Sequence, residues 1–552
     1  MVSTSSTPGP AVSPSPAADV SPRAERILLV AVVALGLAVR FWGLKFGLPV
    51  VYARPDELLL IGVVIGFFRG DPNPHFFEYP TLYLYVLAGV YCLFYARSML
   101  AGWVRDSAEF AASFKVNFVP FFLAARATAA VLGGATVALV HGIARPLFGV
   151  SAGLLAALFM AVAFLHVRDS HYATTDVPMV FFVAAATLAI VRVHCYRRAF
   201  DARLAGVLAG CAMGVKYNAV MLVLPMAIVE GIHAWQVRRD WRRMLRETHL
   251  FRMAACCILM FLAGSPYLLL DYGKALHDLR SLQASTSVGM TPPDLLGRGW
   301  TYHLPHSLWY GVGWPMLISA LAGLAWMAAR HPGPALVLGS FPVAYYVAAG
   351  AGYNVFVRYM LPVVPFLCIF AGYFVASAAS AIAQAMRLRP ALVAAALGVA
   401  VAAPPAINVV QFDRLLTRED SRIVAGRWLA ENVPAGASMF ISGNRYGHPA
   451  MDFVRYRQFG YDYRGNTFTA DRRPTGELPQ WLVIQRAEIP YAHVPQPVED
   501  LIARDYQLAH VVRAYSPEAR NFYDVQDGFY LPFGSFKDVE RPGPNFLIYR
   551  RE

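Results

Sequence analysis

Long runs of apolar residues, separated by short polar stretches, recur through the first 410 residues of the chain. A helix that crosses a bilayer needs about 17–25 predominantly apolar residues. The pattern therefore predicts a polytopic all-α membrane domain with about 11 spans. The expected spans are 27–44, 119–141, 147–167, 178–195, 204–215, 219–236, 252–270, 307–329, 335–350, 360–377 and 390–408.

Two places in this pattern are irregular. The short pair 204–215 and 219–236 is interrupted at Gly214-Val215-Lys216-Tyr217, and such a break lines a cavity more readily than it faces lipid. Residues 80–96 are apolar enough to cross but contain four tyrosines, which suit a membrane interface. A full crossing there would place Asp56 and Asp176 on opposite faces. We therefore expect an interfacial or re-entrant helix, with an ordinary crossing as the alternative.

The composition changes after residue 410. Residues 411–552 are polar and aromatic, and short β-rich runs alternate there with two helical patterns, which predicts a small α/β domain. We expect helices at 421–432 and 498–504 and strands at 438–441, 481–484, 510–512 and 546–549. Residues 1–22 are rich in Ser, Pro, Ala and Thr and are expected to be disordered. The expected division is thus a tail at 1–22, a transmembrane domain at 23–410 and a C-terminal domain at 411–552.

Composition and charge support the membrane assignment. The 552 residues are 57% hydrophobic and 15% charged, against roughly 45–50% and about 25% in soluble proteins. The net charge of +13 does not indicate nucleic-acid binding, because the arginines cluster between apolar segments. The six cysteines lie in or beside apolar segments. Their spacing predicts neither disulfides nor a zinc ribbon.

The arginine-rich loops predict the orientation, because cytoplasmic loops carry an excess of basic residues. Three such loops are expected in the cytoplasm, at 192–203, 238–252 and 387–389. The first apolar segment follows Arg23 and Arg26 and is expected to be a retained anchor with a cytoplasmic amino end. With eleven crossings, the C-terminal domain is then extracytoplasmic, at the plasma or inner membrane of the cell.

Acidic and basic side chains are expected to converge at the outer membrane face. Asp56 and Glu57 follow the first span, and carboxylates so close to lipid usually have a function. Asp176 follows another span at the same face. The outer-face set is Arg54, Asp56, Glu57, Glu78, Arg126, Asp169, His171, Asp176, Lys216, Asp271, His303, His306, Asn354, Arg358 and Tyr359.

This set predicts sugar transfer from a lipid phosphate. A carboxylate can accept a proton from an acceptor hydroxyl, and cations can stabilise a leaving phosphate. Lys216 has no acid within ten residues on either side, so we expect it to contact the donor phosphate. Structural alternatives remain: Arg54 and Arg358 as lipid-facing snorkelling residues, Lys216 as a helix cap, and Asp169 as a partner of Arg168.

The order of the motifs resembles the GT-C superfamily of integral membrane glycosyltransferases. Asp56-Glu57, Glu78-Tyr79-Pro80, Ala125-Arg126, the stretch 170–178, Gly214-Val215-Lys216-Tyr217 and the stretch 357–365 follow one another as they do in that group. The resemblance covers about residues 27–435 and is closest to the dolichyl-phosphate-mannose protein mannosyltransferase and lipid A aminoarabinose transferase branch.

The resemblance implies a role for each matching residue. Asp56 would be the catalytic carboxylate, and Glu57 and Asp176, which lie in the two acidic motifs, would be the other catalytic residues. Arg126, Lys216, Arg358 and Tyr359 would bind the donor phosphate. Glu78 and His303 are the candidates for a divalent metal ion, although Tyr79 stands where the aminoarabinose transferases carry a lysine. The partners would be a polyprenyl-phosphate sugar and a lipid, glycan or protein acceptor, with no nucleic acid.

Two other classes of function remain open. A transporter or lipid flippase would place ionisable groups near the bilayer midplane, often in repeated halves, whereas the charges here flank the spans and no repeat is visible. A membrane sensor with the C-terminal domain as receptor leaves Asp56-Glu57 and Lys216 unexplained. The sugar, the acceptor and the inverting or retaining outcome are not indicated by the sequence.

Overall fold

The computed structural model describes residues 20–288 and 296–552, so most of the expected disordered tail lies outside the described residues. The chain divides by its contacts into two units. The first comprises the described part of residues 1–41 together with Leu60–Val409, and the second comprises Trp42–Leu59 and Val410–Glu552. Residues 42–59, which the sequence places in the transmembrane domain, thus pack with the C-terminal residues.

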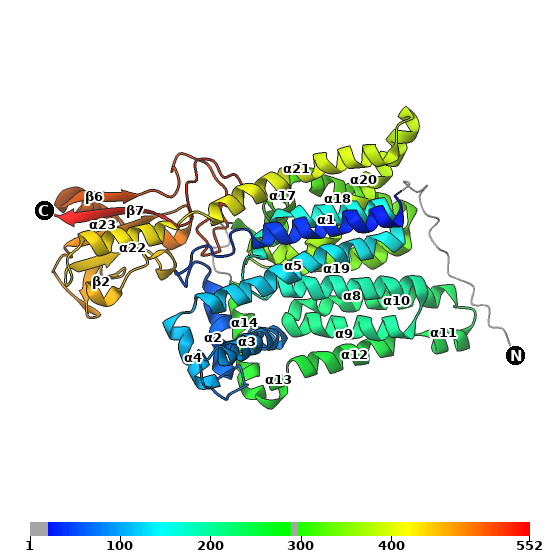
Figure 1. The fold of residues 1–552 in the computed structure, drawn as a ribbon, viewed down its shortest axis with the longest axis horizontal. Helices are drawn as coiled ribbons and strands as arrows, with labels where there is room; N and C mark the ends of the chain where they lie inside the picture. The colour runs from blue at the N-terminus through cyan, green and yellow to red at the C-terminus, as the bar shows by residue number, and fades with distance from the viewer. Residues whose placement is uncertain (1–19, 289–295) are drawn as a thin grey trace. The chain divides into compact units, whose positions relative to one another are not determined.

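The first unit is helical (Figure 1). Its elements are α1 (Pro22–Phe41), α2 (Pro55–Phe67), α3 (Leu82–Leu100), α4 (Ser107–Val116), α5 (Val119–Phe148), α6 (Val150–Val162), α7 (Phe164–Asp169), α8 (Asp176–Tyr196), α9 (Ala199–Val215), η1 (Tyr217–Leu222), α10 (Val223–Gln236), α11 (Trp241–Glu247), α12 (Leu250–Gly264), α13 (Tyr267–Leu270), α14 (Tyr272–Val288), α16 (Gly299–Tyr302), η2 (His303–Leu308), α17 (Trp309–Val312), α18 (Trp314–Arg330), α19 (Pro332–Gly350), η3 (Val357–Val363), α20 (Val364–Met386) and α21 (Pro390–Leu416). The helices α2 and α21 continue into the second unit.

Each expected span corresponds to a helix, although some of these helices are too short or too highly charged to qualify as membrane crossings. Within the described ranges, eight helices are long and apolar enough to cross a membrane, or nine if the bent pair Gly299–Val312 and Trp314–Arg330 is one span. The expected spans in α1, α6 and α9 fall short, because α1 carries four charged residues and α6 and α9 have 13 and 17 residues. Leu82–Leu100 also meets the criterion, so the interfacial placement of 80–96 stays a prediction. The chain is a multi-pass membrane protein.

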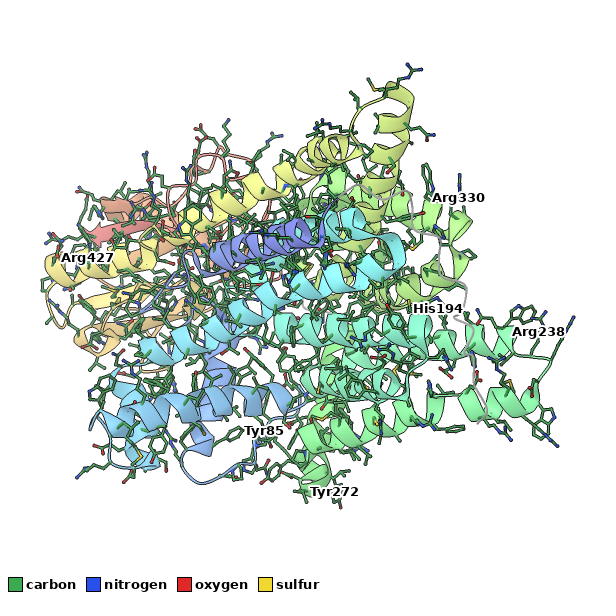
Figure 2. All side chains as sticks on the ribbon, turned by 45° about the vertical axis from the view of Figure 1, so that its right-hand side comes forward. Tyr85, His194, Arg238, Tyr272, Arg330 and Arg427 are labelled. Carbon is green, nitrogen blue, oxygen red and sulfur yellow. The ribbon has the colours of Figure 1, made fainter. Side chains whose placement is uncertain are left out.

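Small residues allow the helices of this unit to pack closely. On α9, a Cβ at Gly206 would lie 2.3 Å from the carbonyl oxygen of Met253, and one at Gly210 would lie 2.5 Å from that of Cys257. Both carbonyls belong to α12, so this four-residue glycine spacing brings two helix backbones together, as is common in membranes. Figure 2 shows Arg238 and Arg330 toward one end of the helices and Tyr85 and Tyr272 toward the other. Arg238, which follows α10, and Arg330, which ends α18, therefore lie toward the same end of the helices.

The second unit is built on one seven-stranded sheet. Its elements are α22 (Ser421–Asn432), β1 (Ser438–Ile441), η4 (Arg445–Gly447), η5 (Phe453–Arg455), β2 (Arg457–Asp462), β3 (Thr467–Ala470), β4 (Arg473–Pro474), β5 (Trp481–Arg486), η6 (Pro490–Ala492), α23 (Gln496–Asp505), β6 (Tyr506–Val512) and β7 (Asn545–Arg551). The strand order is β4-β3-β2-β1-β5-β7-β6. Strand β1 pairs in parallel with β2 and β5, and the other pairs are antiparallel.

A core lies on each face of this sheet. Side chains alternate along a strand, so Met439 and Ile441 of β1 pack with Leu429 of α22, whereas Phe440 packs with Val498 and Leu501 of α23. Helix α22 begins at Asp420, whose side chain accepts from the backbone N–H of Arg422. The expected fold class, an all-α polytopic membrane domain with a small α/β C-terminal domain, is confirmed. The strands β2, β3 and β4 were not expected.

Candidate functional site

The break between α9 and η1 brings Lys216 into contact with a carboxylate. Lys216 ends α9 with an extended backbone, φ −153° and ψ 129°. Its Nζ donates to Oδ1 of Asp176 over 2.6 Å, and the two side chains are 12% and 6% exposed. Asp176 lies in the first turn of α8, where the positive end of the helix dipole favours a carboxylate. The acid that the sequence lacks within ten residues of Lys216 is thus supplied by α8, and contact of Lys216 with a donor phosphate stays a prediction.

Two tyrosine rings flank the same ammonium. The Nζ atom lies 5.8 Å from the ring centroid of Tyr79 and 5.8 Å from that of Tyr359, within the range of a cation–π interaction. Tyr359 comes from η3, and Tyr79 from the segment before α3. The structure therefore brings together Asp176, Lys216 and Tyr359, three predicted site residues that are far apart in sequence. Tyr79, which the sequence showed as a departure from the family, is the fourth member of this group, called here the Lys216 cluster.

The Lys216 cluster is suited to binding an anion. An ammonium has three N–H donors, and within the described ranges one protein acceptor, Asp176, is bonded to Lys216. The lysine is also not fully buried. An incoming phosphate could therefore accept a further charge-assisted hydrogen bond without displacing Asp176. The tyrosine rings restrict the lysine without neutralising its charge.

Other predicted residues of this unit lie in different surroundings. Arg126 on α5 is fully buried, with its guanidinium 5.9 Å from the ring of Phe122. Arg358 is half-buried, 4.5 Å from the ring of Phe356. Asp169 forms an ion pair of 3.2 Å with Arg168, the structural alternative that the sequence left open. Binding of a donor phosphate by Arg126 and Arg358 stays a prediction from the resemblance.

The sequence reading missed Arg40, a charge inside the first apolar run. It is fully buried. Its guanidinium donates to the carbonyl oxygens of Gly36, Met160 and Ala161 and contacts Nδ1 of His166 and Oγ of Ser170 over 3.0 and 3.2 Å. It therefore joins α1 to the α6–α7 connection. A lone arginine in an expected span was the available signal.

Asp56 and Glu57 belong to the C-terminal unit by their contacts. They lie in the first turn of α2, Glu57 fully buried and Asp56 half-buried. The neighbouring Arg54 is 1% exposed and forms an ion pair with Asp527, which is 4% exposed. Arg54 therefore anchors the segment that carries the acidic pair, rather than snorkelling to lipid.

The metal hypothesis rests on Glu78 and His303. Glu78 is exposed, whereas His303 is buried and its Nδ1 lies 2.9 Å from Oγ of Ser307. In the part of the chain that the structure describes, no group of three or more His, Cys, Asp or Glu residues is placed to hold a metal ion. Metal binding stays a prediction from the resemblance.

Comparison with known proteins gives related sequences for part of the chain. A sequence model of the family described as dolichyl-phosphate-mannose-protein mannosyltransferase matches residues 111–267, which contain Arg126, Asp176 and Lys216. Human protein O-mannosyl-transferase 1 is 27% identical over 227 residues, covering 38% of this chain and 28% of the human protein. The chain therefore spans little more than a quarter of this curated relative.

Solved structures extend the comparison to the fold. ArnT from Cupriavidus metallidurans bound to undecaprenyl phosphate aligns with a TM-score of 0.53 at 15% identity, over 94% of this chain and 97% of that one. The apo oligosaccharyltransferase of Archaeoglobus fulgidus aligns with a TM-score of 0.52 at 11% identity, over 77% of this chain and 63% of that one. At these identities the similarity concerns the fold. Together with the matched segment, it confirms that the chain resembles the GT-C superfamily of integral membrane glycosyltransferases.

Proposed function

We propose that this protein is a membrane glycosyltransferase that moves a sugar from a polyprenyl-phosphate-linked donor to an acceptor at the outer face of the cytoplasmic membrane. The matched family is named for a dolichyl-phosphate-mannose donor, and the similar ArnT structure contains undecaprenyl phosphate. Both ligands are polyprenyl phosphates. The acceptor is a lipid, a glycan or a protein.

The observation that carries this proposal is the Lys216 cluster. Its cation lies inside the family-matched segment and keeps hydrogen-bonding capacity beside the carboxylate of Asp176. In the transfer, an acceptor hydroxyl oxygen bonds to the anomeric carbon while the bond from that carbon to the phosphate oxygen breaks. Lys216 would stabilise the charge on the departing polyprenyl phosphate.

The proton of the acceptor hydroxyl needs a base. By the resemblance, Asp56 takes this role, with Glu57 beside it. A carboxylate suits this task when it lies within hydrogen-bond reach of the hydroxyl. Arg126, Arg358 and Tyr359 are proposed as further donor-phosphate residues on the same grounds.

The orientation of the chain is part of the proposal. The common end of Arg238 and Arg330 (Figure 2) supports a cytoplasmic location for the connections that carry them by the positive-inside rule. A cysteine introduced at Val454, which is 93% exposed, should then react with a membrane-impermeant reagent in intact spheroplasts. The unmodified protein measures the background from its own six cysteines. Labelling that requires permeabilisation would contradict the orientation.

The activity is tested with the full chain in lipid vesicles. Short-chain polyprenyl-phosphate sugars, including mannose, glucose, arabinose and aminoarabinose, are supplied with a cell-envelope extract as acceptor. We expect release of free polyprenyl phosphate together with a mass increase of one sugar in the acceptor. Movement of intact donor across the vesicle without cleavage would instead indicate a flippase. Mass spectrometry of envelope glycans from cells with and without the protein identifies the acceptor.

A further inference from the structure

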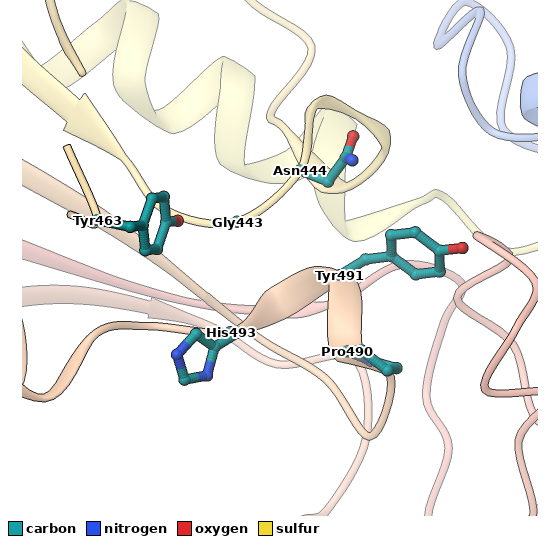
Figure 3. Close-up of a pocket in the computed structure, with 6 residues that line it drawn as sticks. All are labelled: Gly443, Asn444, Tyr463, Pro490, Tyr491 and His493. Atoms are coloured by element: carbon teal, nitrogen blue, oxygen red, sulfur yellow. The ribbon is translucent and has the colours of Figure 1, made fainter. Parts of the chain in front are cut away.

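A pocket of about 360 Å³ lies in the C-terminal unit, and none of the residues assigned to the transfer above lines it. Three loops line it: Gly443 and Asn444 follow β1, Tyr463 follows β2, and Pro490, Tyr491 and His493 follow β5. In Figure 3, Tyr463, Gly443 and Asn444 lie along one side and Pro490, Tyr491 and His493 along the other. Because β2, β1 and β5 are adjacent and parallel, the pocket lies at the carboxyl ends of three neighbouring strands.

The strand order explains why a pocket forms at this edge. In the strand order, β2 lies on the far side of β1 from β5, and β6 lies on the far side of β5 from β1. The connection from β1 to β2 and the connection from β5 through η6 and α23 to β6 therefore run in opposite directions across the sheet. The connections therefore diverge between β1 and β5. Open α/β sheets bind ligands in the crevice outside the carboxyl ends of the strands at such a switch point. The pocket therefore lies where sheets of this topology commonly bind ligands.

The loops of the pocket are fixed to one another. The backbone N–H of Asn444 donates to the carbonyl oxygen of Tyr491 over 2.7 Å, which ties the loop after β1 to the loop after β5. Gly443 adopts φ +72°, and a Cβ there would lie 2.3 Å from Nε2 of Gln485 and 2.7 Å from the Tyr491 carbonyl oxygen. Only glycine fits this close approach. The pocket is therefore preorganised.

The lining residues indicate the class of ligand. None of the six carries a permanent charge, which disfavours a phosphate or nucleotide. The Tyr463 side chain is 56% exposed, and an aromatic face, which is electronegative, attracts the C–H face of a sugar ring. The amide of Asn444 and the exposed imidazole of His493 can bond to hydroxyl groups. The volume is near the lower end of the range of about 300–1,000 Å³ for small-molecule pockets.

We propose that this pocket is a saccharide-binding site that holds a neutral sugar, in the size range of a mono- or disaccharide. Its use in holding the acceptor glycan rests on the proposed function, whereas saccharide binding itself does not. The acceptor would then contain sugar before transfer begins.

The test measures binding of defined saccharides to the full chain in nanodiscs prepared without glycoside detergents, since such detergents would compete. The probes are methyl glycosides of mannose, glucose and galactose and the corresponding disaccharides, observed by saturation-transfer NMR and titration calorimetry. We expect at least one to bind, and Tyr463→Ala and His493→Ala each to weaken that binding by about tenfold, the loss of one stacking or polar contact.

Phe453→Ala is the matched control, because Phe453 is an exposed aromatic of the same unit, at 41% exposure, that does not line the pocket. Its binding should equal that of the unmodified protein. Failure of every saccharide to bind, equal binding by all variants, or binding of a sugar-free acceptor peptide that Tyr463→Ala alone abolishes would each overturn the proposal. Saccharide binding without donor cleavage would contradict the proposed function but support the saccharide site. Donor cleavage without saccharide binding would support the proposed function and contradict the saccharide site.

Discussion

Each of the two units contains a buried ion pair at a helix end, and the two pairs differ in whether the cation keeps hydrogen-bond donors for a ligand. In the C-terminal unit, Arg422 donates twice to Asp420, over 2.8 and 2.6 Å, and once to the carbonyl oxygen of Tyr446 over 2.7 Å. In the membrane unit, Lys216 makes one bond of 2.6 Å to Asp176. Arg422 is 2% exposed and Lys216 12%. The first pair is enclosed and the second remains accessible.

The difference separates a structural charge from a candidate functional one. Burial opposes the charged form of Arg422, but the Asp420 carboxylate outweighs it and raises the pKa of the guanidinium. Asp420 also caps α22, so this pair fixes the start of that helix and, through the Tyr446 carbonyl oxygen, links it to η4. Lys216 is held by one carboxylate and two rings and keeps donors for another anion. Spare hydrogen-bonding capacity, rather than burial, therefore distinguishes the residue that can bind a ligand.

The largest expected effect is at Asp56, which tests whether the C-terminal unit carries chemistry as well as structure. Asp56→Asn should lower sugar transfer by about 10²–10⁴-fold, the usual contribution of a general base. The fold should survive, because Asp56 is half-buried and the amide is of nearly equal size. Donor cleavage in vesicles and thermal unfolding are measured together. Asp71→Asn, at an exposed acid, should be active. An active, folded Asp56→Asn variant would remove Asp56 from the mechanism.

The enclosed pair is tested by breaking it. Arg422→Met should destabilise α22 by about 3–5 kcal/mol, because it leaves a buried carboxylate without its partner. Hydrogen exchange of residues 421–432 in the full-length protein measures the free energy of opening. The sugar-transfer activity of Arg422→Met should fall only in proportion to the fraction of protein that is unfolded.

The same helix supplies the control for this experiment. Arg427 pairs with Glu419, and these side chains are 57% and 42% exposed. An exposed pair contributes about 0–1 kcal/mol, so Arg427→Met should have little effect on exchange. Equal destabilisation by the two substitutions would show that enclosure does not distinguish the pairs.

The accessible pair is tested at Lys216. Lys216→Ala should lower turnover or donor affinity by about 10–100-fold, since a charge-assisted hydrogen bond contributes about 1.5–3 kcal/mol. Lys216→Arg should be partly tolerated, because it keeps the charge. Steady-state kinetics with a short-chain polyprenyl-phosphate sugar distinguish a change in turnover from a change in donor affinity. Lys274 also pairs with an acid, Asp278, but is 42% exposed, and Lys274→Ala should change the kinetics little. Unchanged kinetics in Lys216→Ala would make Lys216 a helix cap.

The smallest effect is a pH dependence confined to the C-terminal unit. Burial lowers the pKa of His448 below 6.5, although its contact with the Gly443 carbonyl oxygen partly opposes this. Below pH 6.5 the unfolded chain therefore binds the proton before the folded one does, and stability falls as the pH decreases. Above pH 6.5 the group contributes no pH dependence. Hydrogen exchange of β1 at about pH 7.5 and about pH 5.5 measures the change.

His448→Gln is the matching control for the pH experiment. It retains a donor for the Gly443 carbonyl oxygen but cannot titrate, so the part of the acid destabilisation due to this residue should disappear. A variant whose exchange responds to pH as strongly as the unmodified protein would assign the effect to other groups.

Features that depend on local pattern were predicted well from the sequence. The boundaries of α22 and β1, Ser421–Asn432 and Ser438–Ile441, agree with the expected ones, because side-chain periodicity and an N-cap are local signals. The strands β2, β3 and β4 were missed because most of their residues are polar and exposed or half-buried. Strands this short and this polar give only a weak form of the alternation that identifies a half-buried strand.

The sequence alone determined that the chain crosses a membrane several times and ends in an α/β domain, since apolar length and alternation are properties of short segments. It also identified Lys216, Asp176 and Tyr359 as candidates. Only the tertiary structure decided that Asp176, 40 residues away, is the anion beside Lys216, and that Arg54 pairs with Asp527 across 473 residues. Such pairs depend on which helix ends and loops pack together, and no local periodicity encodes that choice.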